Sequence, residues 1–306
     1  MRAVFKDKNL EKEFQSEGYI RLPFLGAEQV KQLQETYFTL VKESMGNNMP
    51  GEFLGNPDYA ITYDFTFIDK NIDYKRKTFT EIDKIFKPIY DQILDNYKPI
   101  IGNFIRKKQG NGEVPLHQNW SFIDEKKATS VSIWVPLVDS NVENGTLQVT
   151  PKSHKRFGQF RGPMVPWELE GIKNDIIKNH LVSLDTKAGN CVILDDSIVH
   201  YSAPNTTQGL RLTIQLILHP SEMQSIHYHL NPNKSNSKIE VLAVDHDFYM
   251  NFNPWKLPEN ETSINQLDHA FKPLSEPEFV AQLGKKRYDE KRSLLQRLFQ
   301  ASIKYA

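Results

Sequence analysis

The sequence predicts a mainly β domain, a sandwich or barrel, with flanking helices. From about residue 100, short β-rich runs alternate with turn-forming residues, as strands of a sandwich or barrel do. Within residues 212–219, every second residue is Leu or Ile, which predicts a strand with two distinguishable faces. Before residue 100, apolar residues recur at steps of three and four, the period of an α-helix.

The N-terminal part, residues 1–99, is expected to be mostly helical. Its expected elements are a polar helix over 9–17, a strand over 18–23, an amphipathic helix over 27–42 and a helix over 80–96. In the amphipathic helix, Val30, Leu33, Tyr37 and Leu40 form one face. Residues 46–76 lose this period and are rich in Gly, Asn and aromatic residues, so no regular element is expected there.

The β core is expected to span about residues 100–220. Its expected strands are the runs 103–108, 129–138, 146–150, 181–185, 191–196 and 210–219. A C-terminal extension, residues 221–306, follows and ends in a charged helix over 276–304, with Leu294, Leu295, Leu298 and Phe299 on one side. That helix is expected to pack on the sheet or on a second subunit, so a homodimer stays open. No linker divides the chain, which predicts one domain over 1–306.

Composition excludes several classes of function. The chain has 38 Lys and Arg against 38 Asp and Glu, so no net charge favours nucleic acid or an anionic membrane. Its first residues lack the apolar core of a signal peptide, and no run approaches the ~18 apolar residues that span a bilayer. Cys191 is the only cysteine, which excludes a disulfide within the chain and a multi-cysteine metal site. We therefore expect a cytoplasmic protein whose metal, if any, has His and oxygen ligands.

One group of polar residues inside the β-rich region predicts a metal site. His117 and Asn119 are two positions apart on an extended segment, so their side chains point to the same side. His200, on a distant strand, can add a third ligand and leave the opposite face of the metal open, as non-heme Fe(II) oxygenases require. Arg211 follows after a turn and can hold a carboxylate through two hydrogen bonds, with Ser202 donating another.

Several motifs occur together with these residues, and in a fixed order. They are Glu17 to Pro23, Val114 to Gln118, Trp134 to Asp139, Glu143 to Val149, Pro151 to His154, and finally His200 and Arg211. Over roughly residues 10–220, the sequence thereby resembles the phytanoyl-CoA dioxygenase-like family of Fe(II)/2-oxoglutarate-dependent oxygenases.

The resemblance implies a fold, a reaction and a set of site residues. The implied fold is a double-stranded β-helix, or jelly roll. Fe(II) would be held by His117, Asn119 and His200, and 2-oxoglutarate by Arg211 and Ser202, with Trp134 as a wall of its pocket. With O2, the enzyme would hydroxylate an organic substrate and release succinate and CO2.

Asn119 is a departure from the family, which has Asp at this position. A carboxylate is a charged, strong oxygen ligand, whereas an amide offers a neutral carbonyl oxygen, so iron affinity should be lower. Three explanations stay open. Asn119 ligates weakly in a natural variant, or the site has lost oxygenase chemistry, or an Asp-to-Asn change was introduced to keep the shape while blocking turnover. The alternative function is thus a catalytically impaired member that keeps the fold and the co-substrate pocket as a binding module.

The substrate is expected to be a small molecule, bound by loops at the mouth of the pocket. One candidate loop is the aromatic stretch 52–68, with Phe53, Tyr59, Tyr63 and Phe67. The other, 155–170, carries cations beside aromatic residues, which would suit an anionic or zwitterionic substrate unless these charges are simply solvated. The sequence favours a small polar metabolite or a natural-product intermediate over an acyl-CoA. His227 and His229 share the spacing of metal ligands, but no third ligand follows in a recognisable context.

Overall fold

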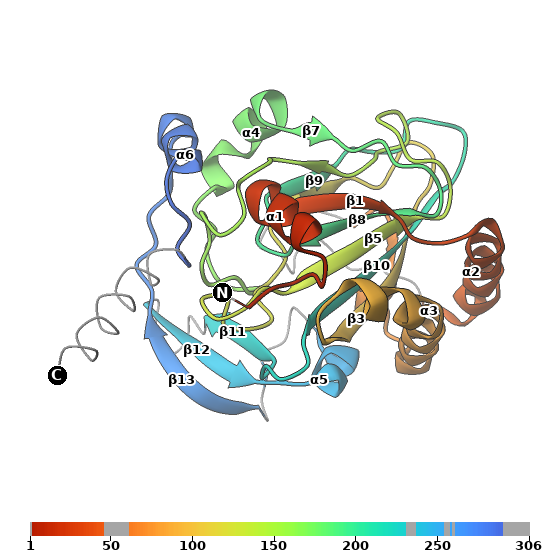
Figure 1. Ribbon diagram of the computed structural model, residues 1–306, viewed down its shortest axis with the longest axis horizontal. Helices are drawn as coiled ribbons and strands as arrows, with labels where there is room; N and C mark the ends of the chain where they lie inside the picture. The colour runs from red at the N-terminus through yellow and green to blue at the C-terminus, as the bar shows by residue number, and fades with distance from the viewer. Residues whose placement is uncertain (1, 46–60, 231–236, 254–257, 259–260, 290–306) are drawn as a thin grey trace.

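The computed structural model describes residues 2–45, 61–230, 237–253, 258 and 261–289. The expected mainly β fold with flanking helices is confirmed (Figure 1). Two antiparallel sheets form the core. In spatial order, the larger sheet contains β1 (Tyr19–Pro23), β8 (Asn190–Asp195), β5 (Val131–Pro136), β10 (Arg211–Pro220), β3 (Tyr97–Lys107) and β2 (Asp64–Phe65). The smaller sheet contains β4 (Val114–His117), β9 (His200–Ser202), β6 (Gln148–Val149) and β7 (Val182–Ser183).

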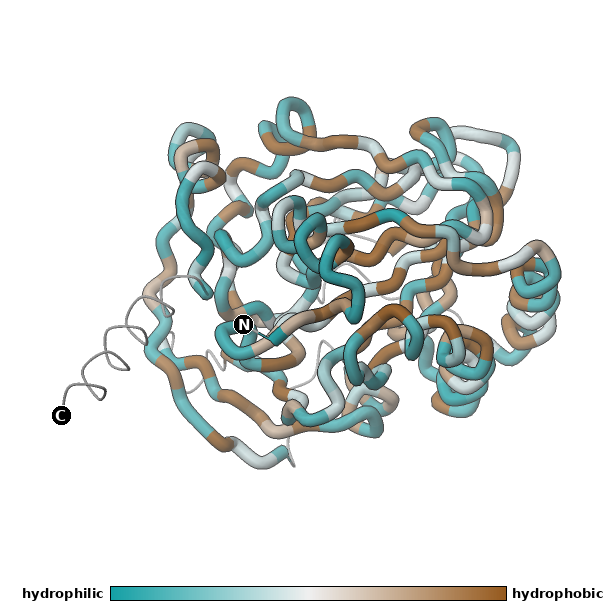
Figure 2. Tube along the Cα trace, in the orientation of Figure 1, coloured by the Kyte–Doolittle hydropathy of each residue, from teal (hydrophilic) through white to brown (hydrophobic). Residues whose placement is uncertain are grey.

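Alternating side chains give the larger sheet two buried faces. On β8, Cys191 and Ile193 enter the main core beneath the helices, whereas Val192 and Leu194 pack against residues of the smaller sheet. Side chains alternate along strand β10 in the same way. Its residues in the main core are Leu212, Ile214, Leu216 and Leu218. Figure 2 shows hydrophobic residues along these central strands and hydrophilic ones on the outward sides of the helices. The predicted two-faced strand is therefore confirmed.

Three helices flank the larger sheet: α1 (Lys8–Glu17), α2 (Ala27–Leu40) and α3 (Ile72–Ile93). In Figure 1, α2 and α3 lie together beside β3, and Leu33 and Phe86 bring them into the main core. The prediction that the last of these helices begins at residue 80 is wrong. Asn71 caps the helix earlier, because its side chain accepts hydrogen bonds from the backbone N–H groups of Asp73 and Tyr74.

The C-terminal extension contains a third sheet that the sequence analysis did not predict. Its strands are β11 (Ile226–Leu230), β12 (Lys238–Ala243) and β13 (Thr262–Asp268), and α5 (His246–Asn251) follows β12. Tyr249 and Phe252 of this extension pack in one aromatic cluster with Phe67 and Trp120. The extension thereby supports the wall of the site described below.

The remaining helices among the described residues are short. They are α4 (Lys173–Asn179), α6 (Glu276–Leu283) and the 3-10 turns Val41–Glu43, Thr66–Ile68 and Glu170–Ile172. The expected helix over 276–304 is wrong in its extent, since α6 ends at Leu283, just before Gly284. Its predicted apolar side at 294–299 lies outside the described residues, as do Phe53 and Tyr59. Among the helices that the structure describes, none combines the length and the apolar character needed to cross a bilayer.

Candidate active site

His117 and His200 meet where β4 pairs with β9. The two residues are direct partners in the antiparallel register, and their ring centroids are 4.1 Å apart. Nδ1 of His117 donates to the carbonyl oxygen of Pro115 at 2.7 Å, and Nδ1 of His200 donates to that of Ile198 at 2.9 Å. Because a carbonyl oxygen only accepts, each neutral ring carries its proton on Nδ1 and keeps a lone pair on Nε2.

This arrangement fits a metal ion. Histidine ligands of metals usually donate their second ring N–H to a backbone carbonyl, as both rings do here. Burial lowers the pKa of His117, and burial together with the neighbouring His117 lowers that of His200 well below its ordinary value. Both imidazoles therefore stay neutral, the form that binds a metal.

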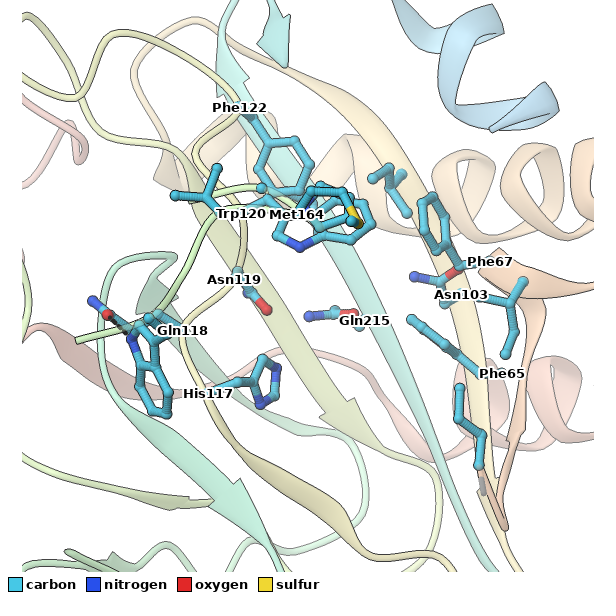
Figure 3. Close-up of a pocket in the computed structure, with 18 of the residues that line it drawn as sticks. Phe65, Phe67, Asn103, His117, Gln118, Asn119, Trp120, Phe122, Met164 and Gln215 are labelled. Carbon is cyan, nitrogen blue, oxygen red and sulfur yellow. Dashed lines mark hydrogen bonds between the residues drawn. The ribbon is translucent and has the colours of Figure 1, made fainter. Parts of the chain in front are cut away.

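Asn119 adds an amide oxygen to this pair. Its Nδ2 donates to Oδ1 of Asp196 at 2.8 Å and to Oγ of Ser132 at 3.0 Å. With the nitrogen held there, the oxygen turns toward the His117 ring (Figure 3). Within the described residues, no group of three His, Cys, Asp or Glu side chains is placed to hold a metal. The candidate ligand set is therefore two imidazoles and one neutral oxygen.

Asp196 is a residue that the sequence analysis missed in this role. Its carboxylate is fully buried behind Asn119 and also accepts a hydrogen bond from Ser132 at 2.6 Å. Burial raises the pKa of Asp196 to about 7, against the opposing effect of these hydrogen bonds. A signal existed in the sequence, since Asp196 is an acidic residue at the end of the apolar run 191–196, just before His200.

Gln118, between the two candidate ligands, holds the surrounding loops in place. Its Nε2 donates to the carbonyl oxygen of Phe157 at 3.1 Å, and its Oε1 accepts from Nε1 of Trp167 at 2.8 Å. The segment therefore alternates as predicted: His117 and Asn119 face the site, while Gln118 is turned toward the loop that carries Trp167 (Figure 3).

A small cavity of about 110 Å³ adjoins the histidine pair. Trp134, Ser202 and Arg211 all line it, together with His117 and His200. The Arg211 side chain is buried, with its guanidinium carbon 5.9 Å from the centre of the Trp134 ring. It donates to Oγ of Ser202 at 2.9 Å, while its Nε has no hydrogen-bond partner within the described chain. The structure thus brings the three predicted co-substrate residues into one cavity.

Lys107, a buried lysine that the sequence analysis did not identify, lies opposite Arg211 in the register of β3 and β10. Its Nζ donates to the carbonyl oxygens of Ser202 and Ala203 at 3.0 and 2.6 Å. Burial and the charge of Arg211 lower the pKa of Lys107 to about 5, and burial lowers that of Arg211 to about 9. Arg211 is therefore the charged group that would receive an anion such as a carboxylate, and an anion bound there would favour protonation of the neighbouring Lys107.

A larger cavity of about 700 Å³ opens on the other side of His117 and Asn119. Its walls are mostly aromatic and aliphatic (Figure 3). The aromatic side chains are Tyr63, Phe65, Phe67, Trp120, Phe122, Trp167 and Phe271. Ligand pockets in proteins typically have 300–1,000 Å³, so this cavity has the size of a substrate site. Of the aromatic loop predicted to form the mouth, Tyr63 and Phe67 do line it.

Two cations of the second predicted loop have a different role from either alternative considered above. Lys155 and Arg161 are buried, not solvated. Arg161 pairs with Glu125 and donates from Nε to the carbonyl oxygen of Asn119 at 2.6 Å, and Lys155 lies 3.6 Å from Asp289. Both cations are paired with acidic residues. They therefore stabilise the loop behind the site and do not bind an anionic substrate.

Comparison with known proteins agrees with this geometry. The family model described as phytanoyl-CoA dioxygenase matches residues 14–213. The chain is similar to the phytanoyl-CoA dioxygenase domain-containing protein 1 homolog of Dictyostelium discoideum, with 33% identity over 150 residues, 46% of this chain and 53% of that protein. It is 26% identical to a phytanoyl-CoA dioxygenase of Arabidopsis thaliana over 165 residues, 50% of this chain and 48% of that protein. The chain thus spans about half the length of these curated relatives.

Solved structures show the same fold. The crystal structure of the non-heme alpha ketoglutarate dependent epimerase SnoN from nogalamycin biosynthesis superposes with a TM-score of 0.51 at 17% identity, covering 72% of this chain and 84% of that one. At this level of identity the likeness concerns the fold alone. It agrees with the jelly roll expected from the sequence.

Proposed function

The chain belongs to the phytanoyl-CoA dioxygenase family, and from this membership and the geometry of the site we propose that it is an Fe(II)/2-oxoglutarate-dependent oxygenase acting on a small molecule. The observation that carries the proposal is the pair His117 and His200, whose Nε2 lone pairs lie next to the buried cavity that contains Arg211. Imidazoles suit iron, and a carboxylate group suits the guanidinium.

The residues have distinct roles in this proposal. His117, His200 and the Asn119 oxygen would hold Fe(II), which supplies the chemistry that combines O2 with 2-oxoglutarate, releasing succinate and CO2 and oxidising the substrate. Arg211, with Lys107 beside it, would bind the far carboxylate of 2-oxoglutarate. Ser202 donates to the carbonyl oxygen of Gly145 at 2.7 Å and accepts from Arg211, so it orients the guanidinium.

Gly145 is needed for this pocket because of its backbone. Its φ is +75°, in the left-handed region, and a Cβ atom there would lie 2.1 Å from the carbonyl oxygen of Ala203. The close approach lets the Gly145 carbonyl accept hydrogen bonds from both Arg211 and Ser202. The small cavity that contains Arg211 and Ser202 is called the anion pocket below. It therefore depends on a tight turn as well as on its basic side chain.

Hydroxylation of the substrate is the finer prediction and rests on the family. The apolar walls of the large cavity support it, since they exclude water from the face of the site that the substrate would occupy. Of the two substrate classes expected from the sequence, this lining suits a natural-product intermediate better than a small polar metabolite. A cytoplasmic location stays a prediction.

Asn119 supports the alternative of a binding module. An amide contributes no charge to a ligand set, so metal affinity falls while the anion pocket stays intact. The same observation favours a weakened but working enzyme, because Asp196 places a carboxylate directly behind the amide. Metal affinity and turnover must therefore be measured separately.

The test has two stages, each with the wild-type chain and the Asn119→Asp variant. First, titration calorimetry with Mn(II) and then 2-oxoglutarate measures binding, with His200→Ala expected to abolish metal binding and His180→Ala, away from the site, expected to keep it. Second, succinate release is measured with Fe(II), ascorbate and a substrate panel. Release by the wild type supports the oxygenase, whereas release only by the double variant Asn119→Asp with Asp196→Asn, measured beside these two chains, supports the binding module. Absence of metal-dependent 2-oxoglutarate binding in both chains overturns the proposal.

A further inference from the structure

The inward-facing residues of β3 and β10 form a ladder that crosses both cavities. Its cross-strand pairs, from the anion pocket outward, are Lys107 with Arg211, Ile105 with Thr213, Asn103 with Gln215, and Ile101 with Ile217. The ladder therefore begins with two basic residues and ends with two isoleucines. The pair of amides lies between them, in the wall of the large cavity that also contains His117 and Asn119.

Asn103 is an unusual residue in this wall. Its side chain is 1% exposed, and neither Nδ2 nor Oδ1 has a hydrogen-bond partner within the described residues. Nearly all buried polar groups in proteins are hydrogen-bonded, and leaving one without a partner destabilises the fold. A buried amide that lines a cavity and lacks a partner is available to a ligand.

Gln215, opposite Asn103, connects this position to the candidate metal site. Its Nε2 lies 3.4 Å from Oγ of Ser132, the same hydroxyl that contacts Asn119 and Asp196. In Figure 3, Gln215 lies between Asn119 and Asn103. A group bound by the two amides would thus be close to the point where the substrate is oxidised.

The rest of the cavity indicates the kind of molecule that carries this group. Among its described lining residues there is no Lys or Arg, and the only carboxylate is Glu170. An anionic group such as the phosphates of an acyl-CoA would find no cation in this wall. The aromatic and aliphatic remainder suits an apolar body.

We propose that Asn103 and Gln215 bind an uncharged hydrogen-bonding group, a hydroxyl or carbonyl, on a predominantly apolar substrate that fills the large cavity. An amide provides both a donor and an acceptor, so the pair recognises either group. That the bound molecule is the substrate rests on the proposed function. The recognition itself depends only on the cavity.

The test compares two probes that differ in one hydroxyl, naphthalene and 2-naphthol. Their binding to the metal-free full chain is measured by titration calorimetry. One buried neutral hydrogen bond makes 2-naphthol bind about fivefold more tightly. In Asn103→Leu this preference is lost, whereas Ile101→Val, a change in the same wall without a change in polarity, keeps it.

Thermal unfolding separates a ligand-binding role from a structural one. An amide that served the fold would lower the melting temperature when replaced. For Asn103→Leu we expect a rise of about 2 °C, because an unpaired buried polar group is removed. Gln215→Met provides a second variant and should also reduce the preference for 2-naphthol.

Three results would overturn the proposal: equal binding of the two probes to the wild type, a preference that survives in Asn103→Leu, or a lowered melting temperature in that variant. These outcomes do not depend on metal. A chain that prefers 2-naphthol but binds no Mn(II) or 2-oxoglutarate contradicts only the proposed function. A chain that binds both but shows no preference contradicts only the amide pair.

Discussion

Nδ2 of Asn119 lies 2.8 Å from Oδ1 of Asp196, and this hydrogen bond decides which end of the Asn119 amide faces His117. A carboxylate can only accept, so the amide nitrogen must point to Asp196 and the oxygen into the site. The carboxyl group that the resemblance leads one to expect on a metal ligand is thus found behind the amide, where burial raises its pKa to about 7.

The charges of positions 119 and 196 can be exchanged. In Asn119→Asp alone, two carboxylates face each other where a donor met an acceptor, so we expect little gain in metal affinity and a lower melting temperature. In the double variant with Asp196→Asn, the amide donor stands at position 196 and the carboxylate at position 119. The carboxylate can then bind the metal. We expect its Mn(II) affinity to exceed that of the wild type at least tenfold, measured by calorimetry.

The single variant Asp196→Asn serves as the control for this exchange. It keeps the shape but removes the charge, and loss of such an outer partner typically weakens metal binding 10- to 100-fold. Mn(II) affinity equal to the wild type in Asp196→Asn would contradict the role given to Asp196.

Lys107 is expected to contribute to 2-oxoglutarate binding. Lys107→Met removes a buried amine that a bound carboxylate would protonate, together with its hydrogen bond to Ser202, and should weaken 2-oxoglutarate binding to the Mn(II)-loaded chain about tenfold, with Mn(II) affinity unchanged. The matched control is Lys108→Met, since Lys108 is the next residue and is exposed. A similar effect of both variants would mean that the cavity responds only to the net charge of the chain.

The buried ion pair between Arg161 and Glu125 is expected to hold the Asn119 backbone in place. Nη1 of Arg161 donates to Oε2 of Glu125 at 2.9 Å, while Nε donates to the Asn119 carbonyl oxygen. Glu125→Gln leaves a buried guanidinium without its counter-ion, which should lower the free energy of unfolding by about 3–5 kcal/mol. Asp124→Asn, which breaks an exposed pair with Lys127 in the same loop, should cost less than about 1 kcal/mol. Urea unfolding measures both, and equal losses would contradict this prediction.

His219 predicts how stability depends on pH. Burial lowers its pKa to about 4, and its ring is hydrogen-bonded in the neutral form, with Nδ1 donating to the Pro220 carbonyl and Nε2 accepting from Ser225. The unfolded chain binds this proton near pH 6.5, so the stabilisation is present above that pH and is lost as the pH falls toward 4.

Urea unfolding at pH 7.5 and 5.0 tests the His219 prediction. The stability advantage of the wild type over His219→Gln should shrink by about 2 kcal/mol between the two pH values. A constant difference would show that His219 does not titrate as its burial indicates.

Much of the candidate site could be recognised before the fold was known. The spacing of His117 and Asn119 predicted that both face one side, since alternation along an extended segment is a local property. The ordered motifs placed His200, Arg211, Ser202 and Trp134 near the same cavity. The structure brings all six predicted residues around two adjoining cavities.

Lys107 and Asn103 show why other site residues were missed. Both lie in a β-rich run that reads like any other strand, and no nearby residue distinguishes them. Their function depends on the register that sets them opposite Arg211 and Gln215 on β10. Likewise, Lys155 and Arg161 look like loop charges until their partners Asp289 and Glu125 are known.

The sequence by itself determined the β core, its flanking helices, the histidine pair with its neighbouring amide and the family, because these depend on local periodicity and on the order of short motifs. Only the tertiary structure decided the lysine beside Arg211, the carboxyl group behind Asn119 and the unpaired amide in the substrate cavity. These are properties of pairs of residues far apart in the chain. Whether a buried polar group has a partner depends on strand register and packing, which no local pattern encodes.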